Sequence, residues 1–536
     1  MRMSIHIVAV RLLLIAAVAL LPAVAHPAAS APNAALGYDD ARHLLARTGF
    51  DPTDAEVRAF GQLTREAAVA KLLRETREIA LTAPPASAVD TSPLRPPGSE
   101  SATAAERMAF AQQQAREGLA LRAWWMQEML VTPSPLTERM TLFWHNHFVS
   151  AQPKVRISRL MYRQNVTLRA HATGNFDTLL HAIAKDPAML VYLDSAQNRK
   201  GAPNENFARE VMELFTLGEG HYTEQDVKEA ARAFTGWSLD RETGQFAYRP
   251  RAHDGGMKTV FGKTGPFDGD AVLDLLLARP ETARHVTAKL WREFVSPDPD
   301  PEQVQRIAAR FRDSNYDIKA ALSELLLCDA FYARANRGVL VKSPAEFVVG
   351  TLRSLELRPD QALPFAIAAA GMGQNLMSPP NVKGWPGGEA WINATTLLAR
   401  KQFVDRLTRA DGLSRADGLS LAIAMNAARP ANADDGEMEG AAVADSTPRG
   451  SPAPGAASAD GVRQQRLTRQ MERGVTSLHF DSADFMTRFP GAAPDERAMW
   501  AQRLLLAVAP QLPTDPAAGS LAVVRGLMLD AAYQLK

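Results

Sequence analysis

Two histidines separated by one residue, His145 and His147, are the first side chains in this sequence whose types and spacing could do chemistry. Imidazoles two positions apart share a face on a strand or in a loop, where both can bind one metal ion. On a helix they point about 200° apart and cannot chelate together. Because the pattern from Pro135 onward is helical, joint binding requires the helix to end near Trp144. The alternative is that one imidazole packs in the core or caps the helix.

A second polar group lies at the start of an expected helix, where Asn204 is a good N-cap. At four-residue spacing Glu205, Arg209 and Glu213 form one row, and Glu210 lies on the adjacent row. One interpretation is a solvated ladder of ion pairs. The other is that Asn204, Glu205 and Glu210 face a cavity, with Arg209 holding a carboxylate that ligates a metal or acts as a general base. The residue types alone leave both open.

A third group is His253-Asp254, followed by two glycines and Lys258. It is expected at the tip of a β-hairpin formed by residues 245–249 and 258–261. Glycines there would let the backbone approach a ligand closely. The alternative is a simple turn in which Asp254 bonds its own backbone. A turn needs neither a histidine nor a lysine, so the pattern favours function.

The segment Pro379–Trp391 contains too much proline and glycine for a helix, and it carries Trp385 and Trp391. Exposed tryptophans on a rigid loop can stack on sugar rings, whereas buried ones fill a core, and the core is the commoner place. The sequence contains no Gly-x-Ser-x-Gly, His-Glu-x-x-His or Cys-x-x-Cys pattern. The commonest serine hydrolases, zinc peptidases and disulfide exchangers are therefore poor expectations.

The elements that must position these residues are mostly helices, so we predict a mainly α fold: a large multi-helix domain with a small β-hairpin insertion. The strongest periodic patterns, several with Pro or a cap at the start, cover residues 38–48, 104–130, 135–148, 280–295, 301–311, 317–327 and 344–355. A capping box with Asp226 in place of Glu, beginning at Thr223, starts a helix expected to end near Gly236.

Composition divides the chain. Residues 1–25 have a positive start, an apolar core and an Ala-Val-Ala cleavage pattern, which together are typical of a secretory signal peptide. A main helical domain is predicted over residues 26–425, with a disordered insert at 82–105. A disordered linker at 426–465, rich in Ala, Asp, Gly, Ser and Pro, leads to a C-terminal helical segment, 466–536, expected to pack on the main domain.

These features predict an exported protein, periplasmic or extracellular, with no membrane span after the signal is removed. The apolar core of the signal is shorter than the ~20 residues of a spanning helix. The formal net charge of +1 gives no general attraction to nucleic acid, which we therefore do not expect as a partner. The single cysteine, Cys328, lies in an apolar run and is expected to be a buried small hydrophobe.

Four motifs, in order along the chain, resemble the domain of unknown function 1800 family of exported bacterial proteins. They are FWHNHF at 143–148, NENFARE at 204–210, HDGGMK at 253–258 and PPNVKGWPGGEAW at 379–391, and the segments 41–45 and 532–535 fit as well. The resemblance implies no established activity, cofactor or catalytic residue. It does imply a partner, because members often occur beside exported proteins of the domain of unknown function 1501 family. It also favours a site at the second motif.

The hypothesis that follows is a hydrolase of an envelope or extracellular polymer, working by acid–base or metal-dependent chemistry. Its catalytic residues would be Glu205, Arg209, Glu210, His253, Asp254 and Lys258; a divalent metal would bind His145, His147, Glu210 and His253; Asn204, Trp385 and Trp391 would bind the ligand. The alternatives are a non-catalytic envelope assembly or binding protein and a carbohydrate-binding protein. An open pocket lined by these groups favours the enzyme, and a sealed network of paired groups favours the scaffold.

Overall fold

The computed structural model describes residues 34–94, 103–240, 242–408 and 459–536. Helices dominate it, and the strands form two separate two-stranded antiparallel sheets. The prediction of a mainly α fold with a small β-hairpin insertion is confirmed. In the described part of the chain, no helix combines the length and apolar character needed to cross a bilayer. The predicted signal peptide, residues 1–25, lies outside the described residues.

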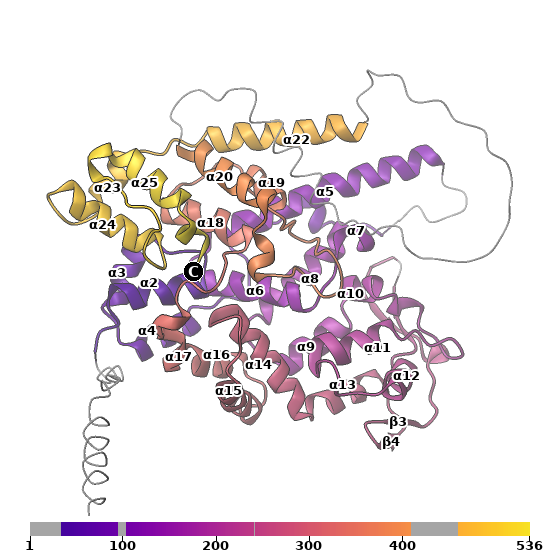
Figure 1. Cartoon of the computed structure of the whole chain (residues 1–536). Helices are drawn as coiled ribbons and strands as arrows, with labels where there is room; N and C mark the ends of the chain where they lie inside the picture. Colours follow the sequence, from indigo (N-terminus) through magenta and orange to yellow (C-terminus); the bar gives the residue numbers. More distant parts are fainter. Residues whose placement is uncertain (1–33, 95–102, 241, 409–458) are drawn as a thin grey trace, which may run out of the picture.

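The elements follow one another along the whole described chain (Figure 1). The longer helices are α2 (Gly37–Thr48), α3 (Asp54–Gly61), α4 (Arg65–Arg74), α5 (Ala104–Val131), α6 (Pro135–His147), α8 (Ser158–Ala170), α9 (Phe176–Ala184), α12 (Glu224–Ala233), α13 (Gly269–Leu277), α14 (Pro280–Phe294), α15 (Pro301–Asp313), α16 (Ile318–Leu327), α18 (Pro344–Ser354), α19 (Leu363–Gly371), α20 (Ala394–Thr408), α22 (Ala459–Thr476), α24 (Pro494–Leu505) and α25 (Ser520–Leu529). Shorter elements include α7 (Gln152–Val155), α10 (Pro187–Tyr192), α11 (Asn206–Glu210), the π-helix η3 (Val211–Thr216), α17 (Asp329–Tyr332), the 3-10 turn η5 (Arg334–Asn336) and α23 (Ser482–Thr487). The strands are β1 (Trp237–Leu239), β2 (Phe246–Tyr248), β3 (Lys258–Val260) and β4 (Lys263–Gly265).

Local start signals explain where several helices begin. Before α12, the side chain of Thr223 accepts the backbone N–H of Asp226, and the Asp226 carboxylate accepts the backbone N–H of Thr223. This is the reciprocal pairing of a capping box, so the predicted helix start is confirmed, with Asp in the place of Glu. Ser343 and Glu346 form the same pairing at the start of α18.

The strands pair differently from the prediction. We expected residues 245–249 to pair with 258–261, but β2 pairs with β1 and β3 pairs with β4. Phe261 and Gly262 both have positive φ, 50° and 73°, and form the two-residue turn that joins β3 directly to β4. The motif at 253–258 therefore ends in β3 and otherwise lies in the connection between two hairpins, rather than at the tip of one.

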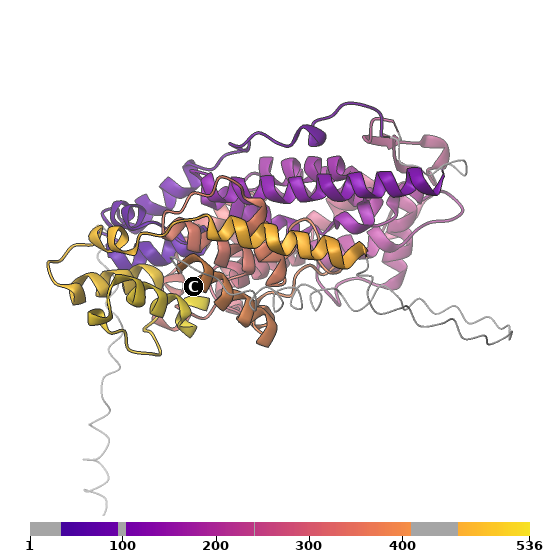
Figure 2. The same ribbon diagram turned by 90° about the horizontal axis from the view of Figure 1, so that it is seen from above.

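Residues 82–94, which composition assigns to a disordered insert, instead pack along one side of the molecule (Figure 2). The Glu128 carboxylate on α5 accepts the backbone N–H and the hydroxyl of Thr82. Arg159 on α8 donates to the backbone carbonyl of Ser92 at 2.7 Å, and Leu94 is buried. Polar side chains of α5 and α8 therefore hold this segment, which contains few apolar residues, against the helices. Of the predicted linker at 426–465, residues 426–458 lie outside the described chain, and α22 begins at Ala459.

The C-terminal helices lie against the first helices of the chain (Figure 1). Helix α24 contacts α2 through Arg42, and the hydroxyl of Tyr533 lies 2.8 Å from that of Thr351 on α18. Helix α19 packs against both α5 and α22 (Figure 2). The core runs continuously through these contacts and includes Cys328, whose predicted burial is confirmed.

Arginine side chains donate hydrogen bonds to the free carbonyls at the ends of two helices. The last carbonyl groups of an α-helix have no partner within the helix and carry partial negative charge. Arg47, fully buried on α2, donates to the carbonyls of Phe294 and Val295 at the end of α14, at 2.9 and 2.8 Å. Arg353 on α18 donates to those of Leu130 and Thr132 at the end of α5. These long-range caps fix helix ends against α2 and α18.

Candidate functional site

Helix α6 continues through His147, so His145 and His147 point to different sides and cannot chelate one metal ion together. His145 is 1 % exposed, and its ring packs edge-on against Trp125 and beside Trp385, with centroids 5.4 and 5.7 Å away. Burial lowers the pKa of His145 to about 4. It is therefore a neutral core residue, as in the alternative interpretation.

His147 caps a helix end. Its Nε2–H donates to the carbonyl of Phe215 at 3.1 Å, while its Nδ1 accepts from the Lys289 ammonium at 3.1 Å. Lys289 and His285 donate to the carbonyl of Leu214 at 2.9 and 3.0 Å. Burial, together with the charge of Lys289, holds the pKa of His147 well below its ordinary value. His147, Lys289 and His285 thus donate hydrogen bonds to backbone carbonyls near the end of the π-helix η3. The wider turn of this helix leaves these carbonyls without a partner.

The second motif is partly the ladder of ion pairs. Asn204 accepts the backbone N–H of Asn206 at 2.9 Å, but the N-cap residue of α11 is Glu205, so the N-cap expected at Asn204 is wrong by one residue. Arg209 donates a two-pronged hydrogen bond to Glu224 on α12 at 2.7 and 2.8 Å, and a longer one of 3.2 Å to Glu205. These contacts tie α11 to α12 at the surface.

Glu210 is the exception in that motif. It is half-buried and, among the residues that the structure describes, it makes no hydrogen bond or ion pair. Burial raises its pKa, and repulsion from Glu213 raises it further. Glu213 itself accepts the hydroxyl hydrogen of Tyr222. Two neighbouring carboxylates therefore have different surroundings, which is the arrangement that separates an acid from a base.

Side chains of the third motif hold its own loop against α12 through hydrogen bonds. Asp254 accepts from Arg232 at 2.8 Å and from the Gly256 N–H at 2.9 Å, and these bonds lower its pKa to about 2. Buried Lys258 donates to the carbonyls of Asp254 and Gly256. His253 Nδ1–H donates to the carbonyl of Thr235 at 2.9 Å. Asp254, Lys258 and the Nδ1 of His253 thus have partners within the loop or on the neighbouring α12 and its end.

Trp385 and Trp391 are 5 % and 6 % exposed, so neither ring is available to stack on a sugar. Carbohydrate binding through these two rings is therefore wrong. Their loop docks on the first motif instead: Asn146 accepts the backbone N–H of Trp385 at 2.7 Å. Gly384 has φ +85° and approaches Asn146 so closely that a Cβ would lie 2.3 Å from its Oδ1.

The predicted metal ligands do not lie close together. Within residues 34–94, 103–240, 242–408 and 459–536, no three His, Cys, Asp or Glu side chains are placed to hold a metal ion. His145, His147, Glu210 and His253 accordingly do not form a common site. The contact between motifs that the structure does show joins 143–148 to 379–391, through Asn146 and the backbone N–H of Trp385.

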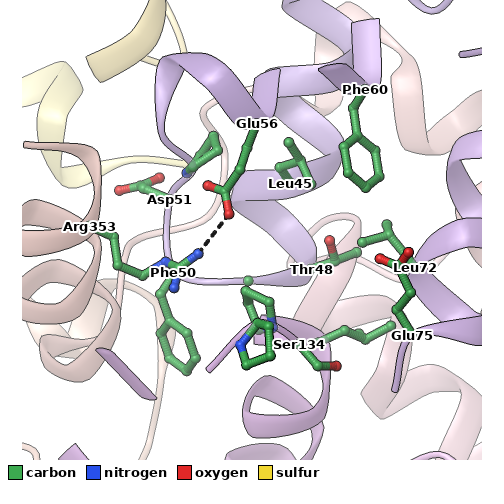
Figure 3. Close-up of a pocket in the computed structure, with 15 residues that line it drawn as sticks. Leu45, Thr48, Phe50, Asp51, Glu56, Phe60, Leu72, Glu75, Ser134 and Arg353 are labelled. Carbon is green, nitrogen blue, oxygen red and sulfur yellow. Dashed lines mark hydrogen bonds and ion pairs between the residues drawn. The ribbon is translucent and has the colours of Figure 1, made fainter. Parts of the chain in front are cut away.

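The pocket in Figure 3 lies between the end of α2, helices α3 and α4, and the start of α6. Glu56 pairs with Arg353 across it at 3.0 Å. Its volume is about 60 Å³, and the rest of its wall is largely apolar. Ligand pockets usually measure about 300–1,000 Å³. This cavity therefore accommodates a few water molecules and not a substrate.

A larger cleft, of about 370 Å³, lies between α2, η5 and the end of α24. Its charged and polar lining comes from Asp39, Arg42, His43, Arg334, Arg337, Gln502 and Arg503, and we call it the arginine cleft. No sequence pattern indicated it, because its lining comes from three segments far apart in the chain, within residues 39–43, 334–337 and 502–509. The segment 41–45, which fits the family resemblance and contains Arg42 and His43, is the one signal in the sequence that lies at this cleft.

The arginine cleft carries uncompensated positive charge. Arg503 pairs with Asp39 at 3.0 Å, and Arg337 pairs with Asp40. Arg42 uses its guanidinium on backbone carbonyls at the end of α24 rather than on a carboxylate. Arg334 makes no hydrogen bond or ion pair through its side chain with any described residue. Two of the four arginines thus lack a carboxylate partner, and an anion entering the cleft would meet a positive field.

The comparisons with known proteins agree with the motifs. A family model described as "Protein of unknown function (DUF1800)" matches residues 43–506. No curated protein matches the chain. No solved structure matches it either.

Proposed function

The chain belongs to the DUF1800 family, and because membership assigns no activity, we propose from the arginine cleft that the protein is a non-catalytic binding protein for an anionic ligand. The observation that carries this proposal is the unequal charge of the cleft, a hollow of about 370 Å³ lined by four arginines. Arg337 and Arg503 are paired with Asp40 and Asp39, whereas Arg42 and Arg334 have no carboxylate partner among the described residues. Guanidinium groups bind phosphate, sulfate and carboxylate through parallel N–H donors.

The burial and pairing of the residues predicted from the sequence also favour a binding function over a catalytic one. Arg209, Asp254 and Lys258 are engaged with protein partners, and His145 and His147 are sealed in the core. A catalytic group must reach the proton or atom on which it acts. Groups that are buried or already paired serve the packing of the helices instead.

The signal-peptide pattern at residues 1–25 supports export. The ligand class that follows is an anionic group on an envelope or extracellular molecule. The proposal is tested by titrating the purified protein with inorganic phosphate and sulfate at low ionic strength in a calorimeter. Saturable binding to either anion that becomes about tenfold weaker in Arg334→Ala supports it, and the absence of a binding heat with both anions overturns it.

One observation favours a second function, acid–base hydrolysis. Glu210 remains unpaired and half-buried beside Glu213, with a raised pKa, at the junction of α11 and a π-helix. Such junctions are frequent at functional sites. In this alternative Glu210 donates the proton and Glu213 acts as the base, without the histidines or a metal ion.

A further inference from the structure

The ring of His43 is oriented by a single backbone bond. Its Nε2 lies 2.8 Å from the carbonyl oxygen of Phe331, and the ring packs against Phe331 and Tyr332. A carbonyl oxygen can only accept, so Nε2 carries the hydrogen. In a neutral imidazole the other nitrogen, Nδ1, is then an acceptor. No described residue donates to Nδ1.

The neutral state of His43 is secured by its surroundings. Burial lowers its pKa to about 2, and the positive charges of Arg47, Arg337 and Arg42 lower it further. The Phe331 carbonyl acts in the opposite direction but more weakly than burial. His43 lines the arginine cleft, and its Nδ1 is not among the unpaired atoms that are sealed from solvent. It therefore adds an acceptor to a lining whose guanidinium groups can only donate.

A ligand that satisfies both kinds of group must accept hydrogen bonds and also donate one. We infer that the arginine cleft selects a phosphate group that retains a proton, with its O–H directed at His43 Nδ1 and its other oxygens at the arginines. This rests on the proposed function and names the ligand class of the same cleft. Hydrogen phosphate keeps at least one proton at neutral pH. Sulfate keeps none, so it would place an oxygen lone pair against the Nδ1 lone pair.

The test compares the two anions on the full chain at pH 7, by calorimetric titration at matched ionic strength. An unsatisfied buried acceptor costs about 1–3 kcal/mol, so phosphate should bind about tenfold to a hundredfold more tightly than sulfate. In His43→Gln the amide nitrogen takes the position of Nε2 and keeps the donor to Phe331, while the Nδ1 acceptor is lost. This variant should bind phosphate no better than sulfate.

Each result decides between the two proposals. If neither anion binds the wild type, the proposed function and this inference both fail. If both anions bind equally, the cleft binds anions but the role of His43 is refuted. A phosphate preference that survives in folded His43→Gln also refutes it.

If His43→Gln does not fold, wild-type protein alone still gives an answer through arsenate. Hydrogen arsenate retains a proton as phosphate does, so it should bind with phosphate-like affinity. An arsenate affinity as weak as that of sulfate would overturn the inference.

Discussion

The Nε of Arg42 lies 3.1 Å from the carbonyl oxygen of Leu504, a residue 462 positions further along the chain. The same guanidinium reaches the carbonyl of Leu505 at 3.4 Å. One side chain therefore caps the end of α24 and, at the same time, forms a wall of the arginine cleft. Stability and the cleft depend on the same contact.

Replacing Arg42 with Met should destabilise the protein. The buried carbonyls of Leu504 and Leu505 would lose their donor, which costs about 2–3 kcal/mol in free energy of unfolding. Urea denaturation followed by circular dichroism measures this loss. Arg310→Met, on the exposed side of α15, is the matched control and should change stability by less than about 0.5 kcal/mol. Equal effects of the two substitutions would refute the capping role of Arg42.

Replacing Arg334 with Ala should weaken anion binding without affecting the fold. Arg334 is exposed and makes no side-chain contact with a charged partner in the described chain. Loss of one charge-assisted donor corresponds to about a tenfold weaker affinity. Calorimetry at two salt concentrations should also show a smaller salt dependence than in the wild type, since fewer charges contribute. Arg310→Ala should leave both quantities unchanged; if it weakens binding equally, the cleft is not the site.

Glu210→Gln should stabilise the protein at about pH 7 but not at about pH 3. A carboxylate whose folded pKa is raised contributes its full stability only below the unfolded pKa, and this contribution is lost as the pH rises through the folded value. Burial and Glu213 raise the pKa of Glu210, so its charged form opposes folding at neutral pH. Urea midpoints at both pH values measure the difference.

Glu224→Gln is the control for Glu210, because hydrogen bonds from Arg209 lower the pKa of Glu224 and its neutralisation should give no gain at neutral pH. Stabilisation by both substitutions would point to net charge rather than to the site. If the protein cleaves an extracellular polymer, Glu210→Gln should abolish that cleavage while the protein stays folded. Persistent cleavage would exclude the acid–base alternative.

Gly384→Ala should be much more harmful than Gly387→Ala. Both glycines have positive φ, 85° and 71°, so an alanine at either is strained by about 1 kcal/mol or more. Only at Gly384 would the new Cβ also collide with Asn146, whereas nothing lies within 4 Å at Gly387. We expect a loss of about 3 kcal/mol or more for Gly384→Ala. Thermal unfolding of the two variants compares them directly, and similar losses would contradict the docking of this loop.

Elements specified by local chemistry were predictable from the sequence. Thr223 with Asp226 marks the start of α12, and periodic apolar residues give α14, α15 and α18 nearly to their ends. The strand partners were not predictable in this way. They depend on Phe261 adopting a left-handed conformation, which its residue type does not favour.

The candidate site was harder to predict than the fold. Two of the motifs, 143–148 and 379–391, are in contact through Asn146 and Trp385, but none of the four lines the arginine cleft. Their histidines, however, serve the core and a helix end, because burial outweighs the chemistry that their spacing suggests. The arginine cleft depends on distances between α2, η5 and α24, and no short pattern encodes these.

The bond between Arg42 and Leu504, together with that between Thr351 and Tyr533, ties α2 and α18 to α24 and the final residues of the chain, which are far away in the sequence. These buried contacts form between the elements themselves, whether or not one polypeptide carries both partners. Two polypeptides produced separately, one that carries α2 and α18 and one that carries α24 and the final residues, should therefore recombine by fragment complementation into one particle. The recombined particle should retain the affinity for anions.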